Sequence, residues 1–354
     1  MAIVGAGPSG LACALTLEKR GICPDIYERS GRTGLHVPMV YLMLELFQRP
    51  HRDQLLYLSK LGINLRPLNR ISRVIMHSPH RSAEVRGSLG YLVERGQGEK
   101  ALEVQLAERL HTKIKFNVEA DYRELSGDYD FVVVADGSSR AAADNKVWET
   151  TMDAWVKGAV ILGEFKPEEA AIFFDTSYAR HGYAFLAPFD RSRAVVMLSV
   201  PDIKRAEVDG FWEKFIRKAN LDLQTVHTFE MNHTSGVSSR QRIENILLTG
   251  NAGGFTDSLL GLGLVMGITS GVLAGRAISE GLDYERMVRP MIRRIKRLIV
   301  FREALNRLDN SGFSMLISAI TLPGVKQAIY NTDLDIINLL YPAVRKLVKK
   351  PHFI

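Results

Sequence analysis

The sequence predicts an α/β protein whose main parallel sheet is built from segments far apart in the chain, and three observations predict it. A glycine-rich turn, GAGPSG (5–10), separates an apolar strand from a helical segment. A continuous Val-rich run, YDFVVVADGSS (129–139), is typical of a strand buried on both faces of a parallel sheet. A third apolar strand, NILLTGNAGG (245–254), also ends in glycines. The expected architecture is a Rossmann-like lobe with an inserted mixed β-sheet lobe and a helical C-terminal segment.

The composition is that of a globular protein large enough for two joined lobes. The chain has 354 residues, 46% of them hydrophobic and 24% charged. It contains only one long uncharged and mostly apolar segment, 258–275, so the sequence does not indicate a polytopic membrane protein. Its two cysteines, Cys13 and Cys23, give no disulfide framework and are expected to stay reduced. The N-terminus has no basic region or cleavage site, so we expect no signal peptide and a cytoplasmic location.

The first thirty residues follow the order strand, helix, strand. Residues 1–4 are a short apolar strand, apolar residues recur at intervals of three and four over 10–21, and 24–29 form a second strand. Residues 30–65 have few features and are expected to be mostly loop and helix. Apolar and polar residues then alternate over 65–93 as in β-strands, and we expect an amphipathic helix over 96–110 and a strand over 113–120.

The second half of the chain changes character at Ser258. Residues 155–235 alternate strand patterns with one helix, 209–220, whereas the chain after Ser258 is chiefly helical. These patterns predict three units. A discontinuous dinucleotide-binding lobe takes residues 1–64, 94–145 and 240–285, a β-sheet lobe for substrate takes 65–93 and 146–239, and a helical segment takes 286–354.

The turn at 5–10 has the GxGxxG spacing of dinucleotide-binding proteins. Gly5 permits the tight turn, Gly7 lets the backbone approach a pyrophosphate, and Gly10 lets helix and strand pack closely. Free N–H groups and the positive end of the helix dipole then face the anion. Eighteen residues past Gly10, Glu28 is placed to accept hydrogen bonds from ribose hydroxyls, and it disfavours a 2′-phosphate. The sequence therefore predicts a site for FAD or NAD rather than NADP.

The segment from Ser258 to Gly275 runs eighteen residues without a formal charge. That length suits a membrane-spanning helix. Glycines at four-residue spacing, which also suit close helix packing in lipid, are Gly263, Gly267, Gly271 and Gly275. The same features suit a buried helix at a ligand site, so the residues alone leave both interpretations open.

Taken together, the three motifs resemble the FAD-binding fold shared by p-hydroxybenzoate hydroxylase and the geranylgeranyl reductase family. In that group a strand ends in Asp-Gly, matched by Asp136-Gly137, and a GDAAG motif is matched by 250–254, with Asn251 at the Asp position. A later GxG is matched by Gly261-Leu262-Gly263, and an arginine that contacts the flavin by Arg95. The resemblance covers roughly residues 1–285.

The resemblance implies that FAD is the cofactor and that the uncharged stretch is the helix that seats its flavin. Unsatisfied N–H groups around Gly263 and Leu264 would then stabilise the negative charge that reduction places at the flavin N1 and O2. The residues expected to bind FAD are Gly5, Ala6, Gly7, Ser9, Gly10, Glu28, Arg29, Arg95, Asp136, Gly137, Asn251, Gly261, Gly263 and Leu264.

Details of the resemblance favour a reductase over a hydroxylase. Gly254 stands where hydroxylases of the group have His, and Ser270-Gly271 is a pair typical of geranylgeranyl reductases. The implied activity is hydride transfer from reduced FAD to a carbon–carbon double bond of a hydrophobic, isoprenoid-type substrate. Tyr183 is a catalytic candidate by position only. The residues expected to line the substrate cavity are Met39, Tyr183, Phe185 and Pro188.

Two alternatives stay open. A flavin-dependent monooxygenase of an aromatic or apolar substrate is one, because both activities occur on this fold. A flavin-binding protein without catalysis is the other, since three positions depart from the family pattern. Asn251 replaces an Asp, Met39 falls where archaeal-type reductases have Cys, and Ser258 replaces a Pro.

The positive charge of the chain is clustered near its end. Residues 286–302 hold seven basic residues and no acid, and 344–350 add four more. The apolar stripe between these charges either packs on the protein or lies on anionic lipid. As partners we expect a hydrophobic or lipid substrate, NAD(P)H or ferredoxin as electron donor, peripheral contact with the inner membrane face, and no nucleic acid.

Overall fold

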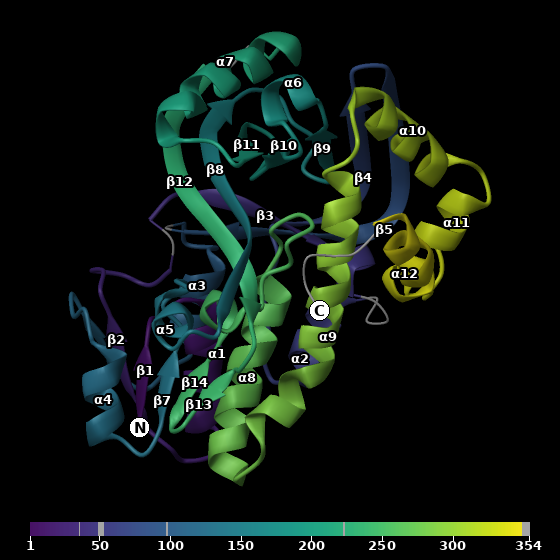
Figure 1. Cartoon of the computed structure of the whole chain (residues 1–354). Coiled ribbons are helices and arrows are strands. Elements are labelled where there is room, and N and C mark those ends of the chain that lie inside the picture. The colour runs from purple at the N-terminus through teal and green to yellow at the C-terminus, as the bar shows by residue number, and fades with distance from the viewer. Residues whose placement is uncertain (35, 49–52, 97, 222–223, 349–354) are drawn as a thin grey trace.

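The structure, a computed structural model, describes residues 1–34, 36–48, 53–96, 98–221 and 224–348. Two β-sheets lie one above the other in Figure 1, and the long strands β8 (Trp148–Leu162) and β12 (Gln224–Ser238) descend from the upper sheet towards the lower one. Helices cover both sheets, and a group of C-terminal helices lies along one edge of the molecule.

The lower sheet has six strands in the order β13-β14-β7-β1-β2-β6. The short β13 (Arg242–Ile243) pairs antiparallel with its neighbour at one edge. The other five strands are parallel: β1 (Ala2–Val4), β2 (Asp25–Glu28), β6 (Ile114–Phe116), β7 (Val132–Val134) and β14 (Ile246–Leu248). With the curled upper sheet and the C-terminal helices, this Rossmann-like sheet confirms the expected fold class.

The Val-rich strand β7 is buried on both faces, as its sequence predicts. Val133 packs in the core shared with α1 (Pro8–Glu18) and α8 (Leu264–Glu280), whereas Val132 and Val134 pack on the opposite face. That second face is covered by α4 (Tyr122–Asp128) and α5 (Arg140–Asp144). Alternate side chains of one strand therefore fill two separate cores, which is why the run is continuously apolar.

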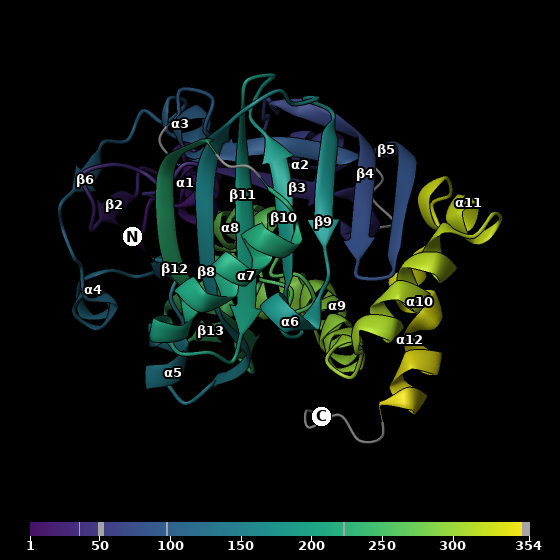
Figure 2. The same ribbon diagram turned by 90° about the horizontal axis from the view of Figure 1, so that it is seen from above.

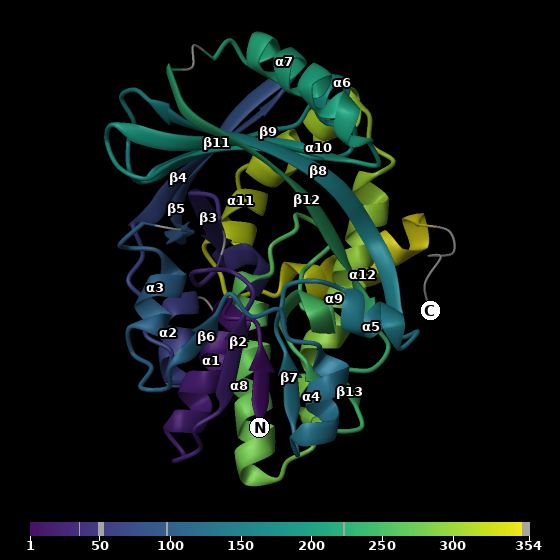
Figure 3. The same cartoon turned by 90° about the vertical axis from the view of Figure 1, so that its left-hand side faces the viewer.

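The helices α1 and α8 cross at very close range beside the sheet (Figure 3). A Cβ atom added to Gly271 would lie 2.0 Å from the carbonyl oxygen of Ser9, and one added to Gly275 would lie 2.9 Å from the Cβ of Thr16. Glycine is required here because the two backbones meet without room for a side chain. The uncharged stretch is thus a buried helix, and none of the described helices is long and apolar enough to span a bilayer.

The upper sheet has eight strands in the order β12-β8-β11-β10-β9-β4-β5-β3. All its pairs are antiparallel except β4 with β9, so the sheet is mixed as expected. Its remaining strands are β3 (Met39–Leu44), β4 (Asn69–Ser78), β5 (Arg81–Arg95), β9 (Glu169–Phe173), β10 (Tyr183–Pro188) and β11 (Arg193–Pro201).

Helices α6 (Thr176–Ala179) and α7 (Val208–Lys218) cover the outer face of the upper sheet (Figures 1 and 2). Phe215 of α7 is fully buried against Ile161, Val196 and Leu198 of the strands beneath it. The inner face of the sheet instead looks towards the lower sheet. Part of this face is covered by α10 (Asn310–Thr321), whose Ile317 packs in the core of the upper sheet, and another part lines a cavity.

Two expectations about the first hundred residues are wrong in detail. Residues 39–44, expected to be loop or helix, form β3, which pairs with β5 from Met39 opposite Arg95 to Leu44 opposite Gly90. The helix expected over 96–110 is shorter: α3 runs from Leu102 to Ala107, because a turn bonded from Ala101 N–H to the Gly98 carbonyl precedes it. Residue 97 lies outside the described residues. The remaining helix of this region, α2, spans Gln54–Lys60.

The chain after Glu280 is helical, as expected. Its helices are α9 (Tyr284–Leu305), α10 (Asn310–Thr321), α11 (Val325–Tyr330) and α12 (Ile336–Leu347). The apolar stripe of α9 packs on the body of the protein, because Ile295, Leu298 and Ile299 are all buried. Of the two interpretations of that stripe, the structure supports packing, so α9 cannot present it to lipid.

Candidate active site

Two glycine-rich turns, 5–10 and 250–254, which we call the first and second glycine corners, contribute to one cleft of about 560 Å³ along the carboxyl edge of the lower sheet. The register of β1 against β2 and β7 brings Val4, Tyr27 and Val134 level, so the loops that follow these strands meet at this edge. Of the residues expected to bind the cofactor, those that line the cleft are Gly5, Gly7, Ser9, Glu28, Arg29, Arg95, Asp136, Gly137, Asn251, Gly261, Gly263 and Leu264.

The remaining two, Ala6 and Gly10, lie just beneath the cleft. Gly10 packs against the turn itself, since a Cβ on it would lie 2.0 Å from the Gly5 carbonyl oxygen. Gly5 has φ +102°, and a Cβ there would lie 2.5 Å from the Ala135 carbonyl oxygen. Gly7 differs, because a Cβ on it would have one neighbour within 4 Å among the described residues, at 3.8 Å. The open side of Gly7 therefore faces the cleft, at the uncapped N-terminus of α1.

Glu28 is fixed at the end of β2 by backbone donors on both sides. Its Oε2 accepts from the Ala6 N–H at 2.8 Å, and its Oε1 accepts from the Ser30 N–H at 2.9 Å. Each carboxylate oxygen keeps a further acceptor position. Because Glu28 also lines the cleft, the carboxylate is held in place for a hydroxyl ligand and repels a phosphate.

Asn251 connects the two sheets at the floor of the cleft. Its Nδ2 donates to the Gly137 carbonyl at 2.9 Å and to the Thr234 carbonyl at 3.0 Å. Its Oδ1 is buried and has no hydrogen-bond partner among the described residues. A buried acceptor without a partner is costly, and this one belongs to a residue of the cleft wall. The amide is therefore suited to accept a hydrogen bond from a bound hydroxyl.

The helix α8 starts at Leu264, with Gly263 as an N-cap that offers no side-chain bond. One expected feature is wrong: the Leu264 N–H is not free, because it donates to the Tyr41 hydroxyl at 3.1 Å. Tyr41 lies on β3, the strand that the sequence did not predict. Gly263 and Leu264 still line the cleft, so the positive end of the helix dipole faces it.

Arg95 lies at the end of β5, where the cleft meets a second cavity. Its guanidinium donates to the buried Glu103 carboxylate at 2.7 and 2.9 Å. The pair fixes a positive charge at the wall of the cleft, and the side chain of Arg95 keeps 17% of its surface exposed. A buried pair of this kind orients the arginine rather than adding much stability.

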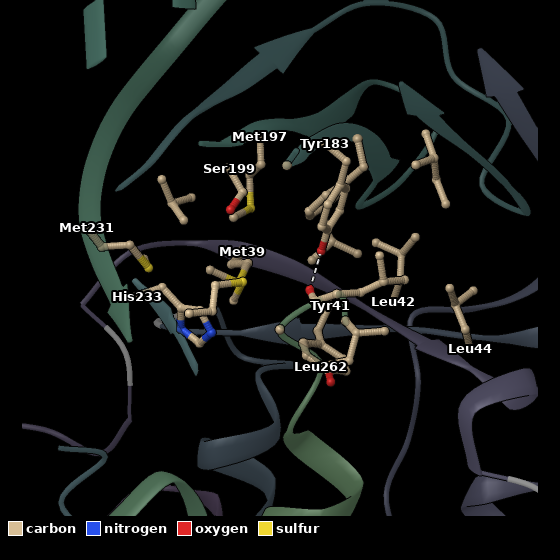
Figure 4. A pocket seen from close by; sticks show the side chains of 18 of the residues that line it. Met39, Tyr41, Leu42, Leu44, Tyr183, Met197, Ser199, Met231, His233 and Leu262 are labelled. Atoms are coloured by element: carbon tan, nitrogen blue, oxygen red, sulfur yellow. Dashed lines mark hydrogen bonds between the residues drawn. The ribbon is translucent and has the colours of Figure 1, made fainter. Parts of the chain in front are cut away.

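The second cavity, of about 180 Å³, lies between the cleft and the inner face of the upper sheet (Figure 4). It shares Tyr41, Arg95, His233 and Gly261 with the cleft, so the two spaces adjoin. Its walls are mainly apolar and include the expected substrate-lining residues Met39, Tyr183 and Phe185. Pro188 does not line it, because that residue is buried at the far end of β10 opposite Ala194.

Tyr183 reaches into this cavity from β10 (Figure 4). Its hydroxyl donates to the Leu260 carbonyl at 2.5 Å. Burial raises the pKa of the phenol, so it keeps its proton throughout the neutral range. To donate that proton elsewhere, the hydroxyl must turn away from Leu260.

His233 is a candidate that the sequence did not reveal. It lies on β12 and lines both the cleft and the second cavity, and its Nε2 is buried with no partner in the part of the chain that the structure describes. Burial lowers the pKa of the imidazole, so it is neutral at neutral pH. The surrounding sequence MNHTS contains no motif, and only the fold of β12 brings this ring to the junction of the two cavities.

A buried acid holds the loop that separates the cleft from the second cavity. Asp257 accepts from the N–H groups of Leu260 and Leu262, each at 2.8 Å. Burial raises its pKa to about 6, against the opposing effect of these bonds and of Arg302. Arg302 of α9 is itself buried and donates to the Leu259 carbonyl at 3.2 Å. Asp257 was visible in the sequence as the last charge before the uncharged stretch.

Comparisons with known proteins agree with this architecture. Residues 3–40 match the family model of the NAD(P)-binding Rossmann-like domain. Over the whole chain, the structure is similar to a geranylgeranyl bacteriochlorophyll reductase-like protein from Thermoplasma acidophilum, with a TM-score of 0.76, 17% identity and 98% of each chain covered.

Two proteins with other names are similar to a lesser degree. The flavin-dependent brominase Bmp2 has a TM-score of 0.68 at 12% identity, with 98% of this chain and 97% of that chain covered. The p-nitrophenol 4-monooxygenase PnpA from Pseudomonas putida DLL-E4 has a TM-score of 0.59 at 17% identity, with 98% and 95% covered. At these identities the likeness establishes the fold alone, and this fold is the one that the sequence motifs predict.

Proposed function

We propose that this protein is an FAD-dependent oxidoreductase that reduces carbon–carbon double bonds of a hydrophobic, isoprenoid-type substrate. The observation that carries the proposal is the continuity of its two spaces. Two glycine corners distant in sequence line one elongated cleft, and the inner end of that cleft adjoins an apolar cavity. Such an arrangement suits a dinucleotide laid along the cleft with its reactive ring at the junction.

The residues present fit FAD. The open side of Gly7 leaves room for a pyrophosphate against the N-terminus of α1, and Glu28 is placed for the ribose of the adenosine. The unpartnered Oδ1 of Asn251 suits a ribityl hydroxyl. The N-terminus of α8 stabilises a ring that gains negative charge on reduction, and this favours a flavin over a nicotinamide at that end.

Reduced flavin supplies a hydride to one carbon of the alkene, and the protein must bring a proton to the other carbon. Tyr183 is our candidate donor because it is a protonated phenol in the wall of the apolar cavity. The neutral His233 faces the same junction and orients the reacting groups. The apolar side chains around them, among them Met39, Phe185 and Met197, exclude water.

The similarity to a geranylgeranyl reductase-like protein supports the reductase assignment. The similarity to a brominase and to a monooxygenase supports the alternative, a flavin-dependent monooxygenase of an aromatic or apolar substrate. Both rest on fold-level likeness, so turnover must decide between them. For the electron donor we propose NAD(P)H or a reduced ferredoxin, acting directly at the flavin.

Anaerobic reoxidation tests the proposal. The FAD-loaded protein is reduced without oxygen and mixed with a polyprenyl alkene, and the return of the oxidised flavin absorbance is followed. We expect reoxidation with conversion of the alkene to its saturated product. If the alkene leaves the flavin reduced while an aromatic compound is hydroxylated at the expense of oxygen, the monooxygenase alternative holds. If neither reaction occurs although FAD is retained, the protein binds flavin without catalysis.

A further inference from the structure

The C-terminal helices expose an unusual amount of apolar surface. Fourteen large hydrophobic side chains of the described residues are exposed, and eight of them fall within 33 residues: Met315, Leu316, Leu322, Val325, Leu334, Leu339, Leu340 and Leu347. Clustered apolar exposure of this kind marks an interaction surface, whereas isolated exposed leucines do not. We call the unit α10–α12 the C-terminal cap.

The exposed side chains of the cap lie on helix faces rather than at random. On α10, Met315 stands one turn before Ala319 and two turns before Leu322, and Met315 is 72% exposed. On α12, Leu339 and Leu347 are two turns apart and 62% and 74% exposed. The cap forms the edge of the molecule farthest from β6 and α4 (Figure 2). Both stripes therefore belong to helices at an outer edge of the molecule.

The charge around the cap indicates the chemistry of that partner. Residues 286–354 contain thirteen basic and four acidic residues, a formal charge of +9, whereas the whole chain carries +7, so the first 285 residues carry −2. Four exposed basic residues follow one another along α9 at helical spacing: Arg286, Arg289, Arg293 and Lys296. Helix α9 packs beside α12 through an ion pair between Arg294 and Asp335 at 2.7 Å. An apolar surface beside a basic stripe complements anionic lipid and disfavours a second copy of the same charge.

An apolar chamber beneath the cap gives the surface a second feature. The chamber has a volume of about 430 Å³ and is lined almost entirely by aliphatic and aromatic side chains of α9–α12, β4 and β5. Leu316 and Leu340 line it and are also 37% and 44% exposed, so the chamber extends to the apolar surface. At the inner end of the chamber, Leu44, Ile172 and Leu260 also line the second cavity of the candidate active site. The chamber and that cavity therefore share an apolar wall.

We propose that the C-terminal cap docks this protein on an anionic lipid bilayer. The exposed stripes of α10 and α12 enter the interfacial layer, and the basic residues of α9 and of the last turn of α12 lie over the headgroups. Docking in this orientation places the apolar chamber, which adjoins the cavity of the proposed site, against the bilayer. The contact is peripheral, and it is made by α10 and α12 rather than by the buried stripe of α9.

Vesicle flotation with the full chain tests this proposal without any need for turnover. We expect the protein to float with vesicles of phosphatidylcholine and phosphatidylglycerol, and to float poorly with phosphatidylcholine alone or at high salt. Leu339→Ser with Leu347→Ser is expected to weaken vesicle affinity by about tenfold for each leucine. The matched control is Leu162→Ser with Val226→Ser, which changes two exposed residues at the opposite edge of the upper sheet.

A second pair of double variants tests the electrostatic contribution to vesicle binding. Arg289→Gln with Lys296→Gln is expected to lower affinity for anionic vesicles by about fivefold for each charge removed. The matched control is Lys214→Gln with Arg217→Gln on α7, which is expected to change that affinity by no more than about twofold. Failure of the wild-type protein to float, or equal losses in the test and control variants, would overturn the proposal. A third outcome would also overturn it: the wild-type protein does not bind vesicles but forms a concentration-dependent dimer in sedimentation, and Leu339→Ser with Leu347→Ser abolishes that dimer. The cap would then be an interface between two copies of the chain. The FAD absorbance of each variant, recorded in parallel, separates these outcomes from a failure of the proposed flavin site.

Discussion

The amide of Asn251 fastens two strands of different sheets at the floor of the cleft. Its Nδ2 donates to carbonyls after β7 and within β12, and only its Oδ1 is left for a ligand. The departure from Asp at this position therefore has a structural use in this chain, since a carboxylate has no proton to donate. A change of motif residue is not by itself a sign of a decayed site.

Asn251→Asp is expected to damage the protein rather than restore a family feature. The carboxylate would face the Gly137 and Thr234 carbonyl oxygens, and two hydrogen bonds would be lost at about 1–3 kcal/mol each. Thermal unfolding with and without FAD measures the effect, with Asn220→Asp, an exposed change, as control. A variant as stable as the wild type that gains turnover would contradict this account.

Asp257 gives the stability a defined dependence on pH. Its pKa is raised by burial to about 6 in the folded protein, so the folded state holds a proton that the unfolded state releases near pH 4. Protonation therefore stabilises the fold, and this contribution of up to about 3 kcal/mol is lost as the pH rises from about 4 to about 7. The free energy of unfolding of Asp257→Asn, measured alongside the wild type across this range, should show a difference that changes with pH. A constant difference would contradict the assigned pKa.

Tyr183→Phe isolates the proposed proton donor. The change removes the hydroxyl but keeps the ring that packs near Phe185, so FAD binding should persist while alkene-dependent reoxidation slows by roughly 10²- to 10⁴-fold. Tyr178→Phe, a buried tyrosine beneath α7, is the control. Reoxidation at the wild-type rate in Tyr183→Phe would remove Tyr183 from the mechanism.

At the scale of elements, the Ser270-Gly271 pair shows what a short motif does physically. Ser270 accepts from the Gly250 N–H at 2.9 Å and donates to the Gly267 carbonyl at 2.7 Å, which ties the second glycine corner to α8. Gly271 lets the backbone of α1 approach, which ties α8 to the first corner. Two adjacent residues of α8 thus fix the positions of the first and second glycine corners relative to each other.

Gly271→Ala is expected to force α1 and α8 apart. The added Cβ would lie 2.0 Å from the Ser9 carbonyl oxygen, an overlap with backbone that costs at least about 1–3 kcal/mol of unfolding free energy. Gly267→Ala on the same helix is the matched control, because its Cβ would meet only the Gly250 Cα at 3.6 Å, and alanine stabilises a helix by about 1 kcal/mol. Denaturant unfolding of the two cofactor-free variants measures both, and equal stabilities would contradict the close crossing.

The parts of the fold that local patterns encode could be predicted from the sequence. The turn at 5–10 and the strands β7 and β14 follow from glycine spacing and continuous apolar runs. The strand β3 could not be predicted, because MVYLML lacks alternation and its pairing with β5 joins residues about fifty positions apart. The Tyr41 bond to Leu264 depends on that strand, and it was missed for the same reason.

The site was predictable to a similar extent. Twelve of the fourteen residues expected to bind the cofactor line the cleft, and most of them lie in or directly beside turns next to a strand end or a helix start, where spacing determines position. His233 was missed, since only the descent of β12 from the upper sheet places its ring at the junction of the two cavities. Side chains delivered by long-range pairing leave no local signal in a sequence.

At the scale of the whole molecule, three spaces follow one another from the lower sheet to the C-terminal cap. The cleft of polar and glycine residues adjoins the second cavity, and the second cavity adjoins the apolar chamber under α10–α12. The polarity of the walls thus falls from the expected cofactor end to the cap surface. This order suits an enzyme that binds a charged dinucleotide at one end and receives an apolar molecule from the other.

The central claim is that both glycine corners hold one flavin dinucleotide, and the visible absorbance of the protein tests it most directly. The purified protein is equilibrated with FAD, passed through a desalting column and scanned, with Gly7→Val, which fills the open side of the first corner, as the control. We predict a resolved flavin spectrum at about one FAD per chain for the wild type and loss of that flavin in Gly7→Val. A wild-type protein that leaves the column colourless would contradict the account.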